Sequence, residues 1–222
     1  MPPYRKDFPI FSHKINGNPL GYLDNGATTQ RPKSVIDTIS EFYSSYNSNI
    51  HRGLHTLSVR ATMACDAARE KVTRYINAAS SDEIIFTYGT THGINLLAYS
   101  FGEQLKAGDE VIISLMEHHA NIVPWQELAK RKKIQLSYIP LTKNFDLDYE
   151  AFERMISKKT KLVSIVHVSN VLGVENDLSR IIRITRKKSK AKVLIDAAQS
   201  IAHIPIDVQK MDCDFLVFSG HK

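Results

Sequence analysis

The sequence has little of what marks a disulfide-stabilised, membrane-spanning or repetitive protein. Its 222 residues include only 2 cysteines, Cys65 and Cys213, which are too few for a disulfide framework in a chain of this size. No apolar run approaches the length of a membrane span, and the N-terminal residues lead into no hydrophobic signal segment. Internal repeats and low-complexity tracts are also absent from the sequence. We therefore expect a globular, cytoplasmic protein that does not associate with membranes.

The positive charge of the chain is modest and only locally clustered. Lys and Arg number 29 against 23 Asp and Glu, which gives a formal net charge of +6. Two basic runs, 130–133 and 186–188, each end a helix-like stretch, where cations favour the negative end of the helix dipole. Neither run is accompanied by an aromatic platform or a nucleic-acid recognition motif. Solvated helix ends are the better interpretation, and we expect no nucleic-acid partner.

From about Ile84 onward, short β-branched runs alternate with helical patterns. This alternation is typical of an α/β fold whose mostly parallel sheet is covered by helices on both faces. The predicted strands are 84–87, 110–114, 134–139, 162–168, 193–196 and 215–218. The predicted helices between them are 93–104, 122–132, 149–157 and 178–189, the last one capped by Asp177. The pattern predicts a sheet domain over residues 81–222.

The two ends of the chain differ from this pattern. Residues 1–80 contain predicted helices at 34–46 and 59–76 joined by a polar connector, and we predict a separate N-terminal helical segment there. At the other end the chain stops at Lys222, soon after an apolar strand and without a closing helix, which would leave part of the sheet exposed. We therefore expect the sequence to be part of a longer one.

Polar residues follow the predicted strands, at the edge where ligands bind in open α/β sheets. The turn from Gly89 through Thr90 and Thr91 opens a helix, whose free N–H groups and hydroxyls suit a phosphate; by itself such a turn is also an ordinary helix cap. His118 and His119 follow the second strand. Adjacent residues of an extended chain point apart and no i, i+4 ligand pattern is present, so we expect no metal site. Stacking of one flat imidazole on an aromatic cofactor ring is the better interpretation, and a structural histidine with its hydrogen bonds satisfied is the alternative.

Two further strand ends carry a carboxylate and an amine. Asp196 ends a buried run and must find a cation or several donors. A protonated pyridine nitrogen is such a cation; a helix N-cap or a salt bridge to lysine are the alternatives. Lys222 follows Ser219 and His221 after the last strand, and its amine can form a Schiff base with an aldehyde if its pKa is lowered. The joint pattern is typical of an enzyme that uses pyridoxal 5'-phosphate (PLP).

These residues resemble the fold type I PLP enzymes and, within the class-V aminotransferase family, the SUF-type (group II) cysteine desulfurases. The similarity runs from Tyr22 to the last residue. The segments that carry it are 22–29, 51–58, 89–95, 117–125, 167–173, 196–199 and 219–222. Three positions depart from the family pattern: Gly26, His92 and Ala197.

The resemblance implies a role for each residue of the site. Lys222 would hold PLP as a Schiff base and move protons, and His118 would stack on the ring. Asp196 would pair with the pyridine nitrogen and Gln199 with the phenolic oxygen. The phosphate would be bound by residues with hydroxyl or imidazole side chains: Thr90, Thr91, Ser219 and His221. The substrate would be bound by Asn25, His55 and Asn170.

The resemblance also implies an activity and partners. It predicts a homodimer that removes sulfur from L-cysteine, gives L-alanine and an enzyme persulfide, and passes the sulfur to a SufE- or SufU-like acceptor for iron–sulfur cluster assembly. Residues 1–80 would contribute to the small domain and to dimer contacts. The persulfide-forming cysteine and the substrate-binding arginine of the family lie after the cofactor lysine, so we interpret Cys65 and Cys213 as buried structural thiols. A selenocysteine lyase, another class-V enzyme and an inactive fragment are the alternatives.

Overall fold

The structure, a computed structural model, describes residues 3–222 and divides into two compact units. Unit 1 consists of the chain up to Tyr75 together with His221 and Lys222, and unit 2 consists of residues 76–220. None of the helices within residues 3–222 combines the length and the hydrophobicity that a membrane-spanning helix needs.

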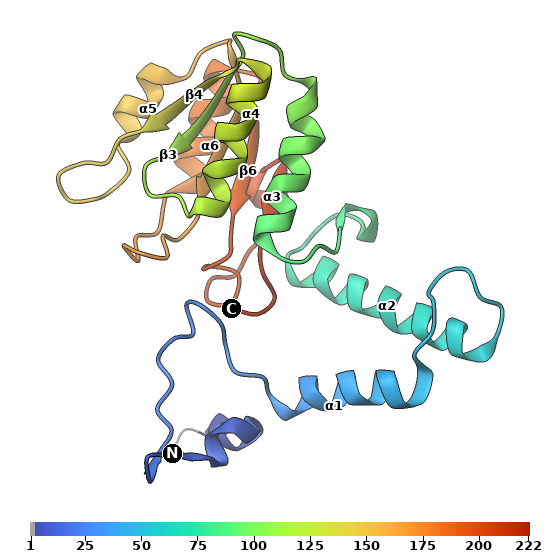
Figure 1. Cartoon of the computed structure of the whole chain (residues 1–222). Helices are drawn as coiled ribbons and strands as arrows, with labels where there is room; N and C mark the ends of the chain where they lie inside the picture. Colours follow the sequence, from blue (N-terminus) through green and yellow to red (C-terminus); the bar gives the residue numbers. More distant parts are fainter. Residues whose placement is uncertain (1–2) are drawn as a thin grey trace. The chain divides into compact units, whose positions relative to one another are not determined.

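Unit 1 is helical with one small hairpin (Figure 1). Its elements are η1 (Pro3–Asp7), η2 (Pro9–Ser12), β1 (Lys14–Ile15), β2 (Asn18–Pro19), α1 (Lys33–Glu41), the π-helical turn η3 (Phe42–Tyr46) and α2 (Thr56–Tyr75). Thr29 also holds the end of the chain here, since its backbone nitrogen and Oγ1 donate to the carbonyl oxygen of His221 at 2.7 and 3.0 Å. The residue before Lys222 is thus fixed to the segment that precedes α1.

Unit 2 is built on a five-stranded parallel sheet with the order β4-β3-β5-β6-β7. Its strands are β3 (Glu110–Ser114), β4 (Gln135–Ile139), β5 (Thr160–Val166), β6 (Lys192–Asp196) and β7 (Phe215–Val217). Its helices are η4 (Ser81–Glu83), α3 (Thr90–Tyr99), η5 (Phe101–Gln104), η6 (His119–Asn121), α4 (Val123–Lys132), α5 (Tyr149–Met155), α6 (Leu178–Lys188) and α7 (Val208–Met211). The strand order reverses between β3 and β5, and such a switch point is where open α/β sheets bind ligands.

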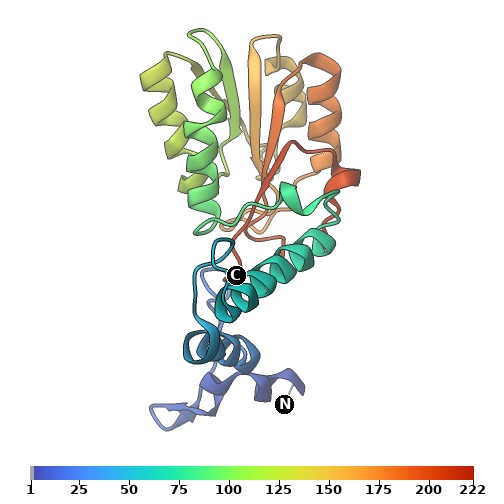
Figure 2. The same ribbon diagram turned by 90° about the vertical axis from the view of Figure 1, so that its right-hand side faces the viewer.

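Helices cover both faces of this sheet (Figure 2). Because side chains alternate along a strand, Ile112 of β3 packs with residues of α5 and α6 in one core, whereas Val111 and Ile113 pack with α3 and α4 in the other. Trp125 of α4 and Phe152 of α5 are fully buried in these two layers. Both faces of the central strands are therefore apolar, as parallel sheets require.

The predicted α/β fold is confirmed, and so is the cap of α6, where Asp177 Oδ1 accepts a hydrogen bond from the backbone nitrogen of Arg180 at 2.9 Å. The predicted strand at 84–87 is wrong. These residues follow η4 in no regular element, and Ile85 and Phe86 are exposed. The apolar run has the composition of a strand, but a strand also needs a neighbouring backbone in register.

Candidate functional site

The carboxyl ends of the strands bring several predicted site residues to one edge of unit 2. Val166 of β5, Asp196 of β6 and Val217 of β7 lie side by side in register. Ser114 ends β3 on the other side of β5. The segments that follow these four residues therefore begin at a common edge, which includes the switch point.

The first part of the site is the N-terminus of α3. Ser219 follows β7, and its Oγ accepts a hydrogen bond from the backbone nitrogen of Thr90 at 2.9 Å and lies 2.9 Å from Thr90 Oγ1. Thr90 and Ser219 are buried, whereas Thr91 is exposed. The other N–H groups in the first turn of a helix have no acceptor within the helix, so this terminus favours an anion.

Gly89 makes this close approach possible. Its φ of +114° lies in a region that side chains rarely adopt, and a Cβ there would lie 3.0 Å from Ser219 Oγ. Next to it, the ring of His92 stacks on Tyr88 and its Nδ1 accepts a hydrogen bond from the backbone nitrogen of Tyr88 at 3.2 Å. His92, one of the three residues that depart from the family pattern, therefore packs on the turn itself.

The second part is the end of β6. Asp196 is 2% exposed, and its Oδ1 accepts a hydrogen bond from the backbone nitrogen of Ala198 at 2.9 Å. Gln199 is half-buried in the turn that follows. Beside them, His167 is buried after β5, and burial lowers its pKa. Its Nδ1 has no hydrogen-bond partner among the residues that the structure describes.

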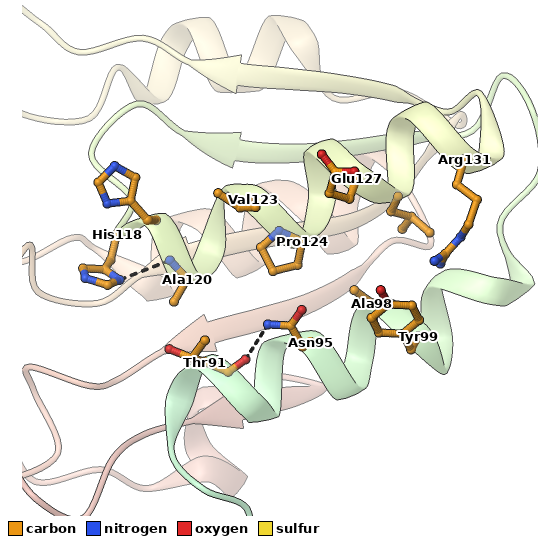
Figure 3. Close-up of a pocket in the computed structure, with 12 residues that line it drawn as sticks. Thr91, Asn95, Ala98, Tyr99, His118, Ala120, Val123, Pro124, Glu127 and Arg131 are labelled. Atoms are coloured by element: carbon orange, nitrogen blue, oxygen red, sulfur yellow. Dashed lines mark hydrogen bonds between the residues drawn. The ribbon is translucent and has the colours of Figure 1, made fainter.

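The third part is a pocket of about 360 Å³ between α3 and α4. Thr91 and His118 lie at one end of it and Arg131 at the other (Figure 3). The ring of His118 is oriented by the backbone nitrogen of Ala120, which donates to His118 Nδ1 at 3.1 Å. An imidazole and the N-terminus of a helix thus line the same cavity.

Sequence reasoning assigned no role to Glu117, which is buried beside His118. Its Oε1 accepts hydrogen bonds from Ser114 Oγ at 2.5 Å and from the backbone nitrogen of Val166 at 3.0 Å, and its Oε2 accepts one from Asn121 Nδ2 at 2.7 Å. Burial raises the pKa of Glu117 from 4.5 to about 7, against the lowering effect of these donors. The sequence signal for a buried carboxyl here was a glutamate only three residues after the end of the strand 110–114.

The remaining predicted residues belong to a loop of unit 2 or to unit 1. Asn170 is exposed in the loop after β5. Four residues belong to unit 1: Asn25, His55, His221 and Lys222.

The two cysteines are only partly buried, so the prediction of buried thiols is wrong in degree. Burial still raises the pKa of Cys213 to about 11. The ligand atoms of His51, Cys65 and Asp66 lie within 4.8 Å of one another. In this group His51 Nε2 is 3.9 Å from Asp66 Oδ1, and both side chains are about half exposed. Such a grouping at the surface does not by itself indicate a metal site.

Comparisons with known proteins show what this chain is similar to. The chain is 50% identical over 219 residues to a protein named probable cysteine desulfurase from Synechocystis sp., and 51% identical over 219 residues to a cysteine desulfurase from Salmonella dublin. These alignments cover 98% of this chain but 52% and 54% of the two relatives. The chain therefore spans about half the length of the curated relatives it matches.

Solved structures of cysteine desulfurases are similar to this chain in fold. A cysteine desulfurase from Thermococcus onnurineus, solved in its apo form, superimposes with a TM-score of 0.89 at 38% identity, covering 98% of this chain and 52% of that one. The cysteine desulfurase CsdA from Escherichia coli superimposes with a TM-score of 0.83 at 33% identity, covering 98% and 53%. The family model described as aminotransferase class-V matches residues 21–222. Because this match spans both units and all the strand ends described above, the chain belongs to the class-V aminotransferase family.

Proposed function

We propose that this chain is the cofactor-holding part of a PLP-dependent cysteine desulfurase, which removes sulfur from L-cysteine and gives L-alanine and an enzyme persulfide. One observation carries the proposal. The buried carboxyl of Asp196 ends β6, and the neighbouring strand β7 leads to Ser219, which is bonded to the N-terminus of α3. A site for a cation and a site for an anion thus follow adjacent strands. PLP has both groups, a ring nitrogen that can carry a proton and a phosphate.

The residues present fit this cofactor. A carboxylate that is 2% exposed requires a cation or several donors, the helix terminus and hydroxyls suit a phosphate, and the imidazole of His118 offers a flat face. When bound, PLP supplies an electron sink. In our proposal Asp196 keeps the proton on the ring nitrogen and Gln199 donates to the phenolic oxygen. The phosphate is held by Thr90, Thr91, Ser219 and His221.

The remaining roles rest on the family resemblance and on the identity of 50% and 51% to two proteins named as cysteine desulfurases. Lys222 holds the cofactor covalently through Nζ and moves protons. Asn25, His55 and Asn170 bind the substrate. We further propose that the whole protein is a homodimer of the SUF type that delivers sulfur to a SufE- or SufU-like acceptor for iron–sulfur cluster assembly. Residues 81–222 would then form most of the PLP-binding domain, and 1–80 would contribute to the small domain and dimer contacts.

A visible absorbance spectrum of the intact protein, taken before and after borohydride reduction, tests the proposal. We expect a band that reduction removes, with the cofactor then recovered on the peptide that contains Lys222. Lys222→Ala should abolish that adduct, whereas Lys210→Ala, whose side chain is 86% exposed, should retain it. A colourless protein that takes up no added PLP would contradict the proposal. Alanine formation from L-cysteine and from L-selenocysteine then decides between a desulfurase and a selenocysteine lyase.

A further inference from the structure

Glu117 is a buried carboxyl to which the proposed chemistry gives no task, and it lies at the switch point of the sheet. Its three donors come from different segments: Ser114 at the end of β3, Val166 at the end of β5 and Asn121 in η6. One side chain therefore joins the two strands on either side of the switch point to the segment that leads into α4.

The hydrogen bond to Val166 has a specific cause. The parallel register pairs Ile113 of β3 with Ser164 of β5, and β3 ends one residue later at Ser114. The backbone nitrogen of Val166 thus lies beyond the last residue of β3. Glu117 Oε1 is the acceptor there, in the place of the carbonyl that a longer strand would offer. A buried N–H without an acceptor is costly, so this carboxyl completes the open end of the ladder.

Asn121 fixes the direction of the hydrogen bonds in the network. Its Oδ1 accepts from Trp125 Nε1 at 2.8 Å and from Ser164 Oγ at 2.6 Å, so its amide nitrogen must face Glu117. All of these side chains are buried. A substitution that reverses one bond therefore places two donors or two acceptors against each other, without water to replace the lost partner.

His118 lies between these two anchors. Glu117 precedes it, and the backbone nitrogen of Asn121 donates to the carbonyl oxygen of His118 at 2.8 Å. We propose that Glu117 is the positioning residue of the site: its three hydrogen bonds fix the loop 115–122 on the ends of β3 and β5 and so set where His118 stands. The consequence for PLP rests on the proposed function, in which His118 stacks on the cofactor ring.

Matched variants of the intact protein separate this role from a general loss of stability. Glu117→Gln keeps the shape of the side chain but turns an amide nitrogen toward the amide nitrogen of Asn121. The pair E117Q/N121D reverses that one hydrogen bond and keeps the rest of the network. The control is Glu110→Gln, because Glu110 is also buried and accepts from two hydroxyls, Ser137 and Thr160, but lies at the opposite end of β3.

Two measurements test whether Glu117 positions the loop: hydrogen exchange of the amides in 115–122 and the Kd for PLP. In E117Q we expect faster exchange in this loop and a Kd about ten-fold higher. The double variant should restore both quantities, and E110Q should leave both unchanged. If E117Q does not fold, the comparison is made between E117Q/N121D, E110Q and the wild type.

Three results would overturn the positioning role: unchanged loop exchange in folded E117Q, equal weakening of PLP binding by E110Q, or a folded double variant that still binds PLP weakly. Weak PLP binding by the folded double variant would mean that PLP binding depends on the position of the negative charge and not on the hydrogen-bond geometry. A wild-type protein that binds no PLP would contradict the proposed function alone, because loop exchange still decides whether Glu117 anchors the loop.

Discussion

Ser219 Oγ lies 2.9 Å from the backbone nitrogen of Thr90 and 2.9 Å from its Oγ1, although 129 residues separate the two in the chain. The segment after the last strand of the sheet is thereby bonded to the first turn of α3. Both residues are buried, so water cannot replace either partner. The helix terminus to which we assign the phosphate is held in place by this pair.

Ser219→Ala should lower the free energy of unfolding by about 1–3 kcal/mol, because the backbone N–H of Thr90 loses its acceptor in a buried place. Thr90→Val removes only the hydroxyl–hydroxyl contact and leaves the hydrogen bond to the backbone, so the free energy of unfolding should fall by less. Urea unfolding of both variants measures the difference. Equal losses would show that the bond to the backbone is not the important one.

Gly89→Ala should destabilise the protein more than Gly108→Ala does. Both glycines have positive φ, +114° and +87°, so both substitutions incur backbone strain of about 1–3 kcal/mol. At Gly108 nothing lies within 4 Å of the added Cβ, whereas at Gly89 it meets Ser219 Oγ at 3.0 Å. Thermal unfolding compares them, and a smaller effect at Gly89 would contradict the close approach. We also expect weaker PLP binding only in the Gly89 variant.

Asp196→Asn should reduce the desulfurase activity that we propose for the whole protein roughly a hundredfold or more, because a neutral amide no longer favours a proton on the ring nitrogen. The amide oxygen can still accept the bond from Ala198, so the fold should remain. Asp207→Asn is the control, since Asp207 caps α7 through the backbone nitrogen of Lys210. Steady-state rates of alanine formation measure the effect, and comparable losses in both variants would argue against the role of Asp196.

The stability of the protein should depend on the protonation of Glu117. Its pKa is about 7 in the folded state, where burial raises it above 4.5, so the folded state binds the proton more tightly. Protonation of Glu117 therefore stabilises the folded state by about 3 kcal/mol. This stabilisation is fully present below pH 4.5 and is lost as the pH rises through 7. The unfolding free energy of the wild type relative to that of E117Q, measured in urea from pH 4.5 to 8, should therefore decrease as the pH rises. A difference that is flat with pH would contradict the raised pKa.

Much of the fold followed from local patterns. The run 110–114 has three apolar, β-branched residues at its centre and forms β3 with the predicted bounds. Asp177 caps α6 because the side chain and the helix it caps are adjacent in the chain. The placement of Asp196 was also predictable, since a carboxylate after three buried apolar residues ends a strand. The helix predicted at 93–104 begins three residues earlier, at Thr90, because the chain turns at Gly89 and the helical conformation can start directly after it.

The sequence by itself thus determined the class of the fold and which residue types stand at the strand ends, because burial alternates with the short period of a strand or helix. Only the tertiary structure decided that 84–87 lies outside the strands, that Ser219 bonds to Thr90, and that Glu117 completes the ladder beside Val166. Each of these three features depends on which distant segment of the backbone lies next to it, and on where one strand ends relative to its neighbour. No local periodicity contains that information, because strand register is fixed by packing between segments far apart in the chain.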